Sequence, residues 1–267
     1  CVCYSSETFS RIPIHLYPFL SGQRFVEIQI DGNQYFGLID TGSAVSMIRK
    51  DVLDEIVNKS YVSKSEYISI KGNRYITPNF KVPEVMIGNF CVETIFQEED
   101  ENFWSDGCAV GGYSFIESCK TYLMYQVYRE VVIGMDLFQK FACIFDFPHS
   151  SIFIAANMSH LIKNTNEFCV VPFEMGKAGV IVSVETDLGE KKFLLDSAAT
   201  MSCISFSSPE ENAICARSQE SETYFSSRLI ISSNNFGGWK FKKLNIASAF
   251  DDIDGILGID FFKRNII

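Results

Sequence analysis

The sequence predicts a mostly β protein with two duplicated, β-barrel-like lobes and a cleft between them. Two observations carry this prediction. Short segments of alternating apolar and polar residues recur along the chain, and one pattern of strands and turns occurs twice in the same order. The chain has 267 residues, of which 47% are hydrophobic and 14% aromatic, so each half is long enough to bury a core of its own.

The predicted strands come in pairs joined by turns. Between Arg24 and Asp40, the dipeptide Asp31-Gly32 separates two alternating runs, which is typical of a β-hairpin. A second hairpin is predicted between Glu66 and Val82, with Lys71-Gly72-Asn73 at its tip. Helix signals are few, and the two clearest lie at Arg49–Val57 and Met135–Phe141.

The same pattern occurs twice along the chain. Residues 26–48 and 182–204 each contain a strand, a turn, a second strand, an aspartate and a hydroxyl residue, in that order. Farther on, 131–141 and 255–265 also match, each with an apolar pair before a glycine. We therefore predict a tandem duplication. Its lobes span 1–160 and 161–267, and the first carries an insertion near 100–125.

An aspartate follows the second strand of each repeat, Asp40 in the first lobe and Asp196 in the second. A twofold relation between the lobes would bring the two carboxyls together. At a few ångströms both cannot ionise, so they share one proton, and their titration belongs to the pair. Such a pair offers a base that activates water and an acid that protonates a carbonyl oxygen. We therefore predict hydrolysis of peptide bonds without a metal, a cofactor or a covalent intermediate.

The residues after each aspartate fit this chemistry. Thr41 and Ser197 supply hydroxyls that can bond to backbone groups of the opposite lobe and lock the two loops together. Gly42 allows a tight turn and leaves its N–H free to face a carboxylate oxygen. Ser43 can add a side-chain hydrogen bond to Asp40 and favour its charged form.

These loops, D-T-G-S at Asp40–Ser43 and D-S-A-A at Asp196–Ala199, resemble those of aspartic proteases of the pepsin and retropepsin superfamily. The later motifs V-I-G-M-D and I-L-G-I-D strengthen the resemblance. The two-lobed arrangement is similar to pepsin, whereas the G-M-D-L-F and G-I-D-F-F endings are similar to single-domain retropepsins. The resemblance implies a bilobal acid-protease fold and aspartic-type endopeptidase activity on peptide or protein substrates, with Asp40 and Asp196 as the catalytic residues.

The second loop departs from the family pattern. Ala198 stands where the family has glycine, and Ala199 where pepsin-like enzymes usually have Ser or Thr. An alanine costs little at a negative φ, but about 1 kcal/mol or more in a left-handed conformation. An alternative is therefore a catalytically impaired pseudoprotease that binds a peptide or a partner protein in the cleft. A dimer that builds the pair from two chains is a third interpretation, but the duplication makes it unnecessary and predicts a monomer.

In this family, β-hairpin flaps close over the cleft and exclude water. Tyr67 and Tyr75, on the second predicted hairpin, are candidates for the side chain that covers Asp40. In the second lobe, Phe236 and Trp239 are candidates for apolar cover. Each of these aromatic residues also suits a place in the core.

Composition and motifs argue against several other functions. The formal net charge is −10 and no block of Lys or Arg occurs, so we expect no nucleic-acid partner. No apolar window approaches the length of about 18 residues that predicts a membrane span. The sequence has no C-x-x-C pair, no nucleophile elbow and no phosphate-binding glycine loop, so no metal site, serine hydrolase or nucleotide site is predicted.

The nine cysteines leave the compartment open. Cys108 and Cys119 bracket a glycine-rich segment and could close a small disulfide loop, whereas Cys143 and Cys203 stand among apolar residues and are predicted to be buried. Cys1 suits a lipid-modified residue. The sequence therefore favours a secreted or cell-envelope location and leaves a cytoplasmic one open.

Overall fold

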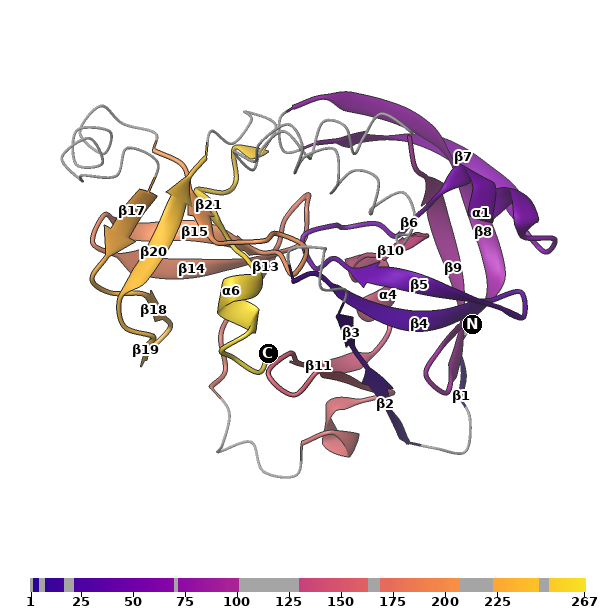
Figure 1. The fold of residues 1–267 in the computed structure, drawn as a ribbon, viewed down its shortest axis with the longest axis horizontal. Coiled ribbons are helices and arrows are strands. Elements are labelled where there is room, and N and C mark those ends of the chain that lie inside the picture. Colours follow the sequence, from indigo (N-terminus) through magenta and orange to yellow (C-terminus); the bar gives the residue numbers. More distant parts are fainter. Residues whose placement is uncertain are drawn as a thin grey trace.

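The protein is mostly β, as the sequence predicts. The computed structural model describes residues 2–4, 8–16, 22–69, 72–100, 130–162, 169–206, 223–244 and 250–267. Two large sheets occupy the two ends of the long axis, and a smaller sheet lies between and beneath them (Figure 1). The predicted lobe boundary at 160/161 falls between the strands of the two large sheets.

The first large sheet takes its strands from the first half of the chain. In spatial order they are β1 (Val2–Tyr4), β9 (Phe90–Glu98), β6 (Met47–Ile48), β10 (Val131–Ile133), β5 (Asn33–Ile39), β4 (Arg24–Ile30), β8 (Arg74–Ile87) and β7 (Ser60–Ile68), and β3 (His15–Leu16) pairs with β4. Because β8 also pairs with β9, the strands from β9 to β8 close into a barrel.

The second large sheet has a similar order of strands, without a closing pair among the described residues. Its strands, in spatial order, are β17 (Thr223–Ser226), β20 (Trp239–Lys243), β16 (Cys203–Ile204), β21 (Gly255–Leu257), β15 (Gly189–Leu195), β14 (Val180–Thr186), β18 (Ile230–Ile231) and β19 (Asn234–Asn235), and β13 (Glu174–Met175) pairs with β14. In the first sheet β10 runs parallel to β5 and antiparallel to β6. In the second, β21 runs parallel to β15 and antiparallel to β16, so the two sheets share this pairing of strands.

The small sheet consists of β11 (Ala142–Asp146), β12 (Ser151–Ala155) and β2 (Phe9–Pro13), and the short 3-10 helix η1 (Met158–His160) follows β12. Residue Ile267 also joins it, since its backbone exchanges hydrogen bonds of 2.6 and 3.2 Å with Phe145 of β11. The sheet therefore connects both halves of the chain.

The local signals in the sequence correspond to real turns and helices. Asp31 and Gly32 have φ values of 51° and 85° and form the turn between β4 and β5, which explains the glycine. The two predicted helices are present as α1 (Lys50–Glu55) and α4 (Met135–Phe138). A third helix, α6 (Ile259–Phe262), occupies the same place after β21 that α4 occupies after β10.

Helix α6 fastens the two halves together through two neighbouring phenylalanines. Phe262 is 1% exposed and lies 5.2 Å from the ring of Phe147 in the core of the first half. Phe261 is 4% exposed and lies 5.8 Å from Trp239 in the core of the second half. One turn of helix thus contributes to both cores.

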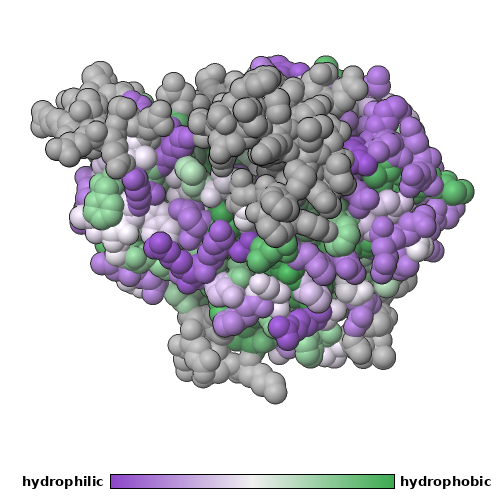
Figure 2. Space-filling view, viewed as in Figure 1, coloured by the Kyte–Doolittle hydropathy of each residue, from purple (hydrophilic) through white to green (hydrophobic). Residues whose placement is uncertain are grey.

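Polar and apolar residues are mixed on the face shown in Figure 2. Hydrophilic residues cover much of the right-hand side, and hydrophobic residues occur there and elsewhere in small groups. Among the helices described, none has the length and apolar character needed to cross a bilayer.

Replacing Phe262 tests the role of α6. We expect Phe262→Ala to lower the free energy of unfolding by about 3–5 kcal/mol, because it opens a cavity at the contact with Phe147. Urea denaturation followed by circular dichroism measures this change. Phe225→Ala is a matched control, because Phe225 is 63% exposed and its loss should change stability by less than about 0.5 kcal/mol. Equal effects of the two changes would contradict the assignment.

Candidate active site

The first loop begins where β5 ends. Ile39, the last residue of β5, pairs with Ile133 of β10, and the next backbone N–H, that of Asp40, donates to the carbonyl oxygen of Ile133 at 3.0 Å. The parallel neighbour strand therefore fixes the direction in which Asp40 leaves the sheet.

The second loop is built in the same way. Leu195 at the end of β15 pairs with Leu257 of β21, and the backbone N–H of Asp196 donates to the carbonyl oxygen of Leu257 at 3.0 Å. Both aspartates keep some exposed surface. The duplication thus presents two equivalent carboxyls on equivalent strand ends.

Four hydrogen bonds between the lobes join the loops symmetrically. The hydroxyl of Thr41 donates to the carbonyl oxygen of Leu195 at 2.8 Å, and the hydroxyl of Ser197 donates to that of Ile39 at 2.8 Å. Each hydroxyl also accepts a hydrogen bond from the other residue's backbone. The N–H of Ser197 donates to the Thr41 hydroxyl at 3.0 Å, and the N–H of Thr41 donates to the Ser197 hydroxyl at 3.1 Å. These are the cross-lobe contacts predicted for Thr41 and Ser197, and both residues are buried.

The two carboxyls meet at this junction. A side-chain hydrogen bond joins Asp196 to Asp40. A Cβ atom built on Gly42 would lie 2.5 Å from Cγ of Asp196, so the first loop passes directly against the second carboxyl. Gly42 does not have a positive φ. The glycine is therefore required for space and not for an unusual backbone conformation.

The pKa of Asp196 is raised above that of an ordinary aspartate. Burial is the largest cause, because it disfavours the charged form. The backbone N–H groups of Ala199 and Ala198 and the side chain of Asp40 act in the opposite direction. The site therefore favours a proton on the carboxyl pair under conditions in which a free aspartate would have lost it.

The alanines of the second loop are accommodated without backbone strain. Among the described non-glycine residues, positive φ values occur at Asp31, Ser150 and Ser232, and not at Ala198. The N–H groups of Ala198 and Ala199 donate to Oδ1 of Asp196 at 2.8 and 2.9 Å. Ala198 thus keeps the hydrogen bond that Gly42 makes in the first loop, where its N–H donates to Oδ1 of Asp40 at 3.0 Å.

The hydroxyl of Ser43 donates to the carbonyl oxygen of Val45 at 2.7 Å. This bond turns the side chain toward the backbone of its own loop, and the predicted bond from Ser43 to the Asp40 carboxyl stays a prediction.

The glycine of each apolar-apolar-glycine motif packs beneath its loop. A Cβ atom on Gly134 would lie 2.4 Å from the carbonyl oxygen of Val45, and one on Gly258 would lie 2.6 Å from that of Met201. No other residue type fits so close to backbone atoms.

Sequence reasoning missed Gln23, which also crosses between the lobes. Its side-chain amide donates to the carbonyl oxygen of Ala198 at 3.2 Å, from a position just before β4. Gln23 is 3% exposed, so it supports the second loop from within the protein. The signal was weak, because a single glutamine beside a strand usually faces solvent.

The candidate flap residues of the first lobe lie together on the long hairpin of β7 and β8, which runs along the top of the view in Figure 1. Tyr67 and Tyr75 are directly paired across it and stack with their ring centroids 5.1 Å apart. The backbone N–H of Asp100 donates to the Tyr67 hydroxyl at 3.0 Å, and burial raises the pKa of Tyr67. The hairpin is present, and its cover of Asp40 stays a prediction.

The two candidates of the second lobe pack on the same ring. Phe236 is partly buried with its ring 5.3 Å from that of Phe261, and its cover of the cleft stays a prediction. Trp239 is 5% exposed and packs on Phe261 within the core, which corrects the expectation that Trp239 covers the cleft. The physical reason is the pairing of β20, which contains Trp239 and runs parallel to β16 as β9 runs parallel to β6. Trp239 therefore stands on the counterpart of β9 and not on a flap hairpin.

Both cysteines that the sequence predicts to be buried lie within the described residues. Cys203 is 6% exposed, as predicted, and Cys143 is partly buried against the core of the first half. The predicted loop between Cys108 and Cys119, the predicted insertion near 100–125 and Cys1 lie outside the residues that the structure describes.

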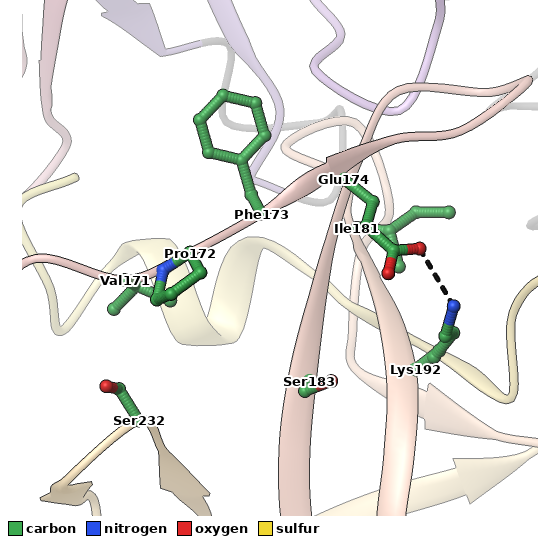
Figure 3. Close-up of a pocket in the computed structure, with 8 residues that line it drawn as sticks. All are labelled: Val171, Pro172, Phe173, Glu174, Ile181, Ser183, Lys192 and Ser232. Atoms are coloured by element: carbon green, nitrogen blue, oxygen red, sulfur yellow. Dashed lines mark hydrogen bonds and ion pairs between the residues drawn. The ribbon is translucent and has the colours of Figure 1, made fainter.

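A separate pocket of about 320 Å³ lies on the outer side of the second lobe. It is lined by Val171, Pro172, Phe173, Glu174, Ile181, Ser183, Lys192 and Ser232 (Figure 3). Glu174 and Lys192 face each other in an ion pair of 2.8 Å. Neither Asp40 nor Asp196 lines this pocket, and its one carboxylate, that of Glu174, is paired with Lys192. The pocket is therefore separate from the two aspartates of the loops.

Within the described part of the chain, no group of three or more His, Cys, Asp and Glu side chains is placed to hold a metal ion.

Comparison with known proteins adds no identification, since no family model and no curated protein sequence matches the chain.

The cross-lobe hydrogen bonds can be tested with Thr41→Val, which keeps the shape of the side chain. We expect the free energy of unfolding to fall by about 2 kcal/mol or more, because the Leu195 oxygen and the Ser197 N–H lose their partner in a buried place. Ser43→Ala is the control, because it removes an exposed hydroxyl of the same loop. A Thr41→Val protein as stable as the control would contradict this role.

The raised pKa of Asp196 predicts a pH dependence of stability. The folded state holds the proton of Asp196 more tightly than the unfolded state does. The contribution of Asp196 to the free energy of unfolding is therefore full below the unfolded pKa and is lost as the pH rises through the folded pKa. Asp196→Asn removes the charge, so we expect it to be more stable than the wild type near neutral pH and to lose this advantage in strong acid. Urea denaturation over a pH series gives the difference. An advantage that grows toward acid would refute the assigned direction.

Proposed function

We propose that the protein is an aspartic endopeptidase that hydrolyses peptide bonds with a water molecule held between Asp40 and Asp196. The observation that carries the proposal is the junction of the two aspartate loops, where four symmetric hydrogen bonds join the lobes and Gly42 lies directly against the carboxyl of Asp196. The resemblance of both loops to those of aspartic proteases supports it, and so does the matching arrangement of strands around them.

In the proposed reaction the pair starts with one proton. The ionised carboxylate takes a proton from water while the water oxygen attacks the carbonyl carbon of the peptide. The other carboxyl gives its proton to the carbonyl oxygen, which forms a tetrahedral diol. The carboxyl that took the proton from water then donates it to the amide nitrogen, while the other carboxylate takes a proton from one hydroxyl of the diol. The carbon–nitrogen bond breaks, a carboxylic acid and an amine form, and the pair returns to its starting state. Activity should therefore fall both where the pair is fully protonated and where it is fully ionised.

The geometry of the second loop favours an active pair over a degenerate one. Ala198 has no left-handed backbone, and its N–H is bonded to Asp196. Oδ1 of Asp196 accepts the two loop N–H groups and is thereby held in place. The long hairpin of β7 and β8 is the element we propose as a flap over an extended peptide substrate.

Replacing either aspartate tests the proposal. We expect Asp40→Asn and Asp196→Asn to lower kcat for a peptide substrate by about 10²–10⁴-fold or more, because neither variant can share a proton. Cleavage of an unfolded protein or a peptide library at acidic pH, read by mass spectrometry, measures the loss. A statine-type transition-state analogue should inhibit the wild type. Asp31→Asn, in the turn between β4 and β5, is the control, since asparagine tolerates the positive φ of that position.

Undiminished cleavage by Asp196→Asn would refute the carboxyl pair. Saturable peptide binding without turnover at any acidic or neutral pH would instead favour a binding protein that keeps the cleft. In that case Ala198→Gly is informative, because a return of turnover would locate the defect in a single methyl group.

A further inference from the structure

A buried serine lies beneath the first loop and is bonded to an aspartate of the following helix. Ser46 has no exposed surface. Its hydroxyl accepts the backbone N–H of Gly134 at 3.0 Å and donates to Oδ1 of Asp136 at 2.7 Å. The backbone N–H of Ser46 is also bonded to the Asp136 carboxyl. Asp136 stands in the first turn of α4.

The second loop has the same construction. Ser202 has no exposed surface, and its hydroxyl accepts the N–H of Gly258 at 3.1 Å and donates to Oδ1 of Asp260 at 2.8 Å. The backbone N–H of Ser202 donates to the same oxygen at 2.8 Å. Asp260 stands in the first turn of α6. The two halves therefore share this contact atom for atom.

Each serine is one peptide unit away from a bond that orients an aspartate of the pair. Gly134, which the Ser46 hydroxyl holds, follows Ile133, whose carbonyl oxygen accepts the N–H of Asp40. Gly258 follows Leu257 in the same relation to Asp196. A shift at either serine is thus transmitted through one rigid peptide to the start of a carboxyl-bearing loop.

The carbonyl oxygens of the serines tie the loops to a further strand. That of Ser46 accepts the N–H of Gln97, and that of Ser202 accepts the N–H of Lys242, both at 3.0 Å. Each serine therefore joins the loop, the strand after it, the helix and a neighbouring strand at one point.

Stability alone does not account for these contacts. Burial raises the pKa of Asp136, which means that its charged form is disfavoured where it stands. Apolar residues of similar size commonly replace buried ionic groups without loss of stability. The same hydrogen-bonded contact between a buried serine and a helix aspartate occurs in both halves, and we explain it by the geometry that it imposes.

We infer that Ser46 with Asp136, and Ser202 with Asp260, are positioning residues that set the separation of the Asp40 and Asp196 carboxyls. The inference rests on the proposed function, because it assigns these pairs a role in that reaction. The separation decides how strongly the two carboxyls hold their shared proton, since the repulsion of two charges falls with distance.

Ser46→Ala and Ser202→Ala test the inference in the full-length protein. The primary measurement is an NMR titration of the Asp40 and Asp196 side-chain carboxyl carbons, which needs no turnover. We expect the two apparent pKa values of the pair to move closer together by about one unit, because a looser pair repels less. In a peptide-cleavage assay, kcat should fall about 10–100-fold while KM changes less than about twofold, since the loss affects alignment of the reacting groups.

The groups that titrate beside the pair and the serines are unchanged in these variants. Cys203 lies within electrostatic reach of Asp196 and Asp260, and Lys140 within reach of Asp136. The Ser46 hydroxyl is one of the groups that lower the pKa of Asp136, so the titration of Asp136 is followed together with that of the pair. A change at the pair that appears while Asp136 keeps its charge reports the geometry of the carboxyls.

Ser226→Ala is the matched control. Ser226 is equally buried, and its hydroxyl also accepts one backbone N–H and donates to one oxygen, in contacts with Asp187 and Arg228. Asp187 lies in the turn between β14 and β15, at the end of these strands opposite Asp196. This variant should lose similar stability but leave the carboxyl titration and kcat unchanged.

A second pair of variants distinguishes the loss of the Ser46–Asp136 hydrogen bonds from a general loss of structure. Asp136→Asn keeps an oxygen that can accept the bonds of Ser46 and should retain most of the wild-type titration and kcat. Asp136→Leu cannot accept them and should reproduce Ser46→Ala. If Ser46→Ala fails to fold, Ser46→Cys takes its place, because its thiol keeps the size but weakens both bonds.

Folded Ser46→Ala and Ser202→Ala proteins with the wild-type titration and kcat would overturn the inference. A wild type that cleaves no peptide would refute the proposed function instead. The carboxyl titration would then still decide whether the serines position the pair.

Discussion

The structure depends on the four hydrogen bonds that Thr41 and Ser197 make across the lobes. Each bond contributes about 0.5–1.5 kcal/mol net, so the set contributes about 2–6 kcal/mol. Two full charges 4 Å apart repel by about 4 kcal/mol at an effective dielectric constant of 20. Because these terms are similar in size, the junction can hold two carboxyls together without separating the lobes, and the pair responds to the remaining repulsion by keeping a proton. The arrangement of both sheets around the loops serves this one junction.

The departure at Ala198 shows how the two loops can differ while the junction stays symmetric. A methyl group on Gly42 would collide with Asp196, whereas Ala198 keeps an ordinary backbone and its bond to the carboxylate. Gln23 holds the carbonyl oxygen of Ala198 from the opposite lobe. The second loop is thus supported by a residue of the opposite lobe. A methyl group is tolerated at position 198 in the second loop but not at the equivalent position 42 in the first.

Sequence could predict whatever depends on neighbours in the chain. The turn at Asp31-Gly32, the short helices and the two aspartates at strand ends all follow from local patterns, and laying one half over the other indicated that they belong together. It could not place Trp239, because a short apolar strand carries no mark of its partner, and the parallel pairing of β20 with β16 decides the matter. Nor could it find Gln23, whose contact spans 175 residues. Ser46 and Ser202 occupied matching places in the two repeats, but a serine just before a short apolar strand gives no sign of the carboxylate it will meet.

The two phenylalanines of α6 constrain how this chain can change in length. Successive residues of a helix point about 100° apart, which is how Phe261 and Phe262 reach different cores from one turn. Losing or gaining one residue between β21 and this turn would rotate both rings away from their sites at once. Insertions in loops are usually tolerated, so variation in length should accumulate elsewhere and stop short of α6. Among descendants of the same duplication, the spacing from Gly258 to these two rings should be the most constant length in the second half.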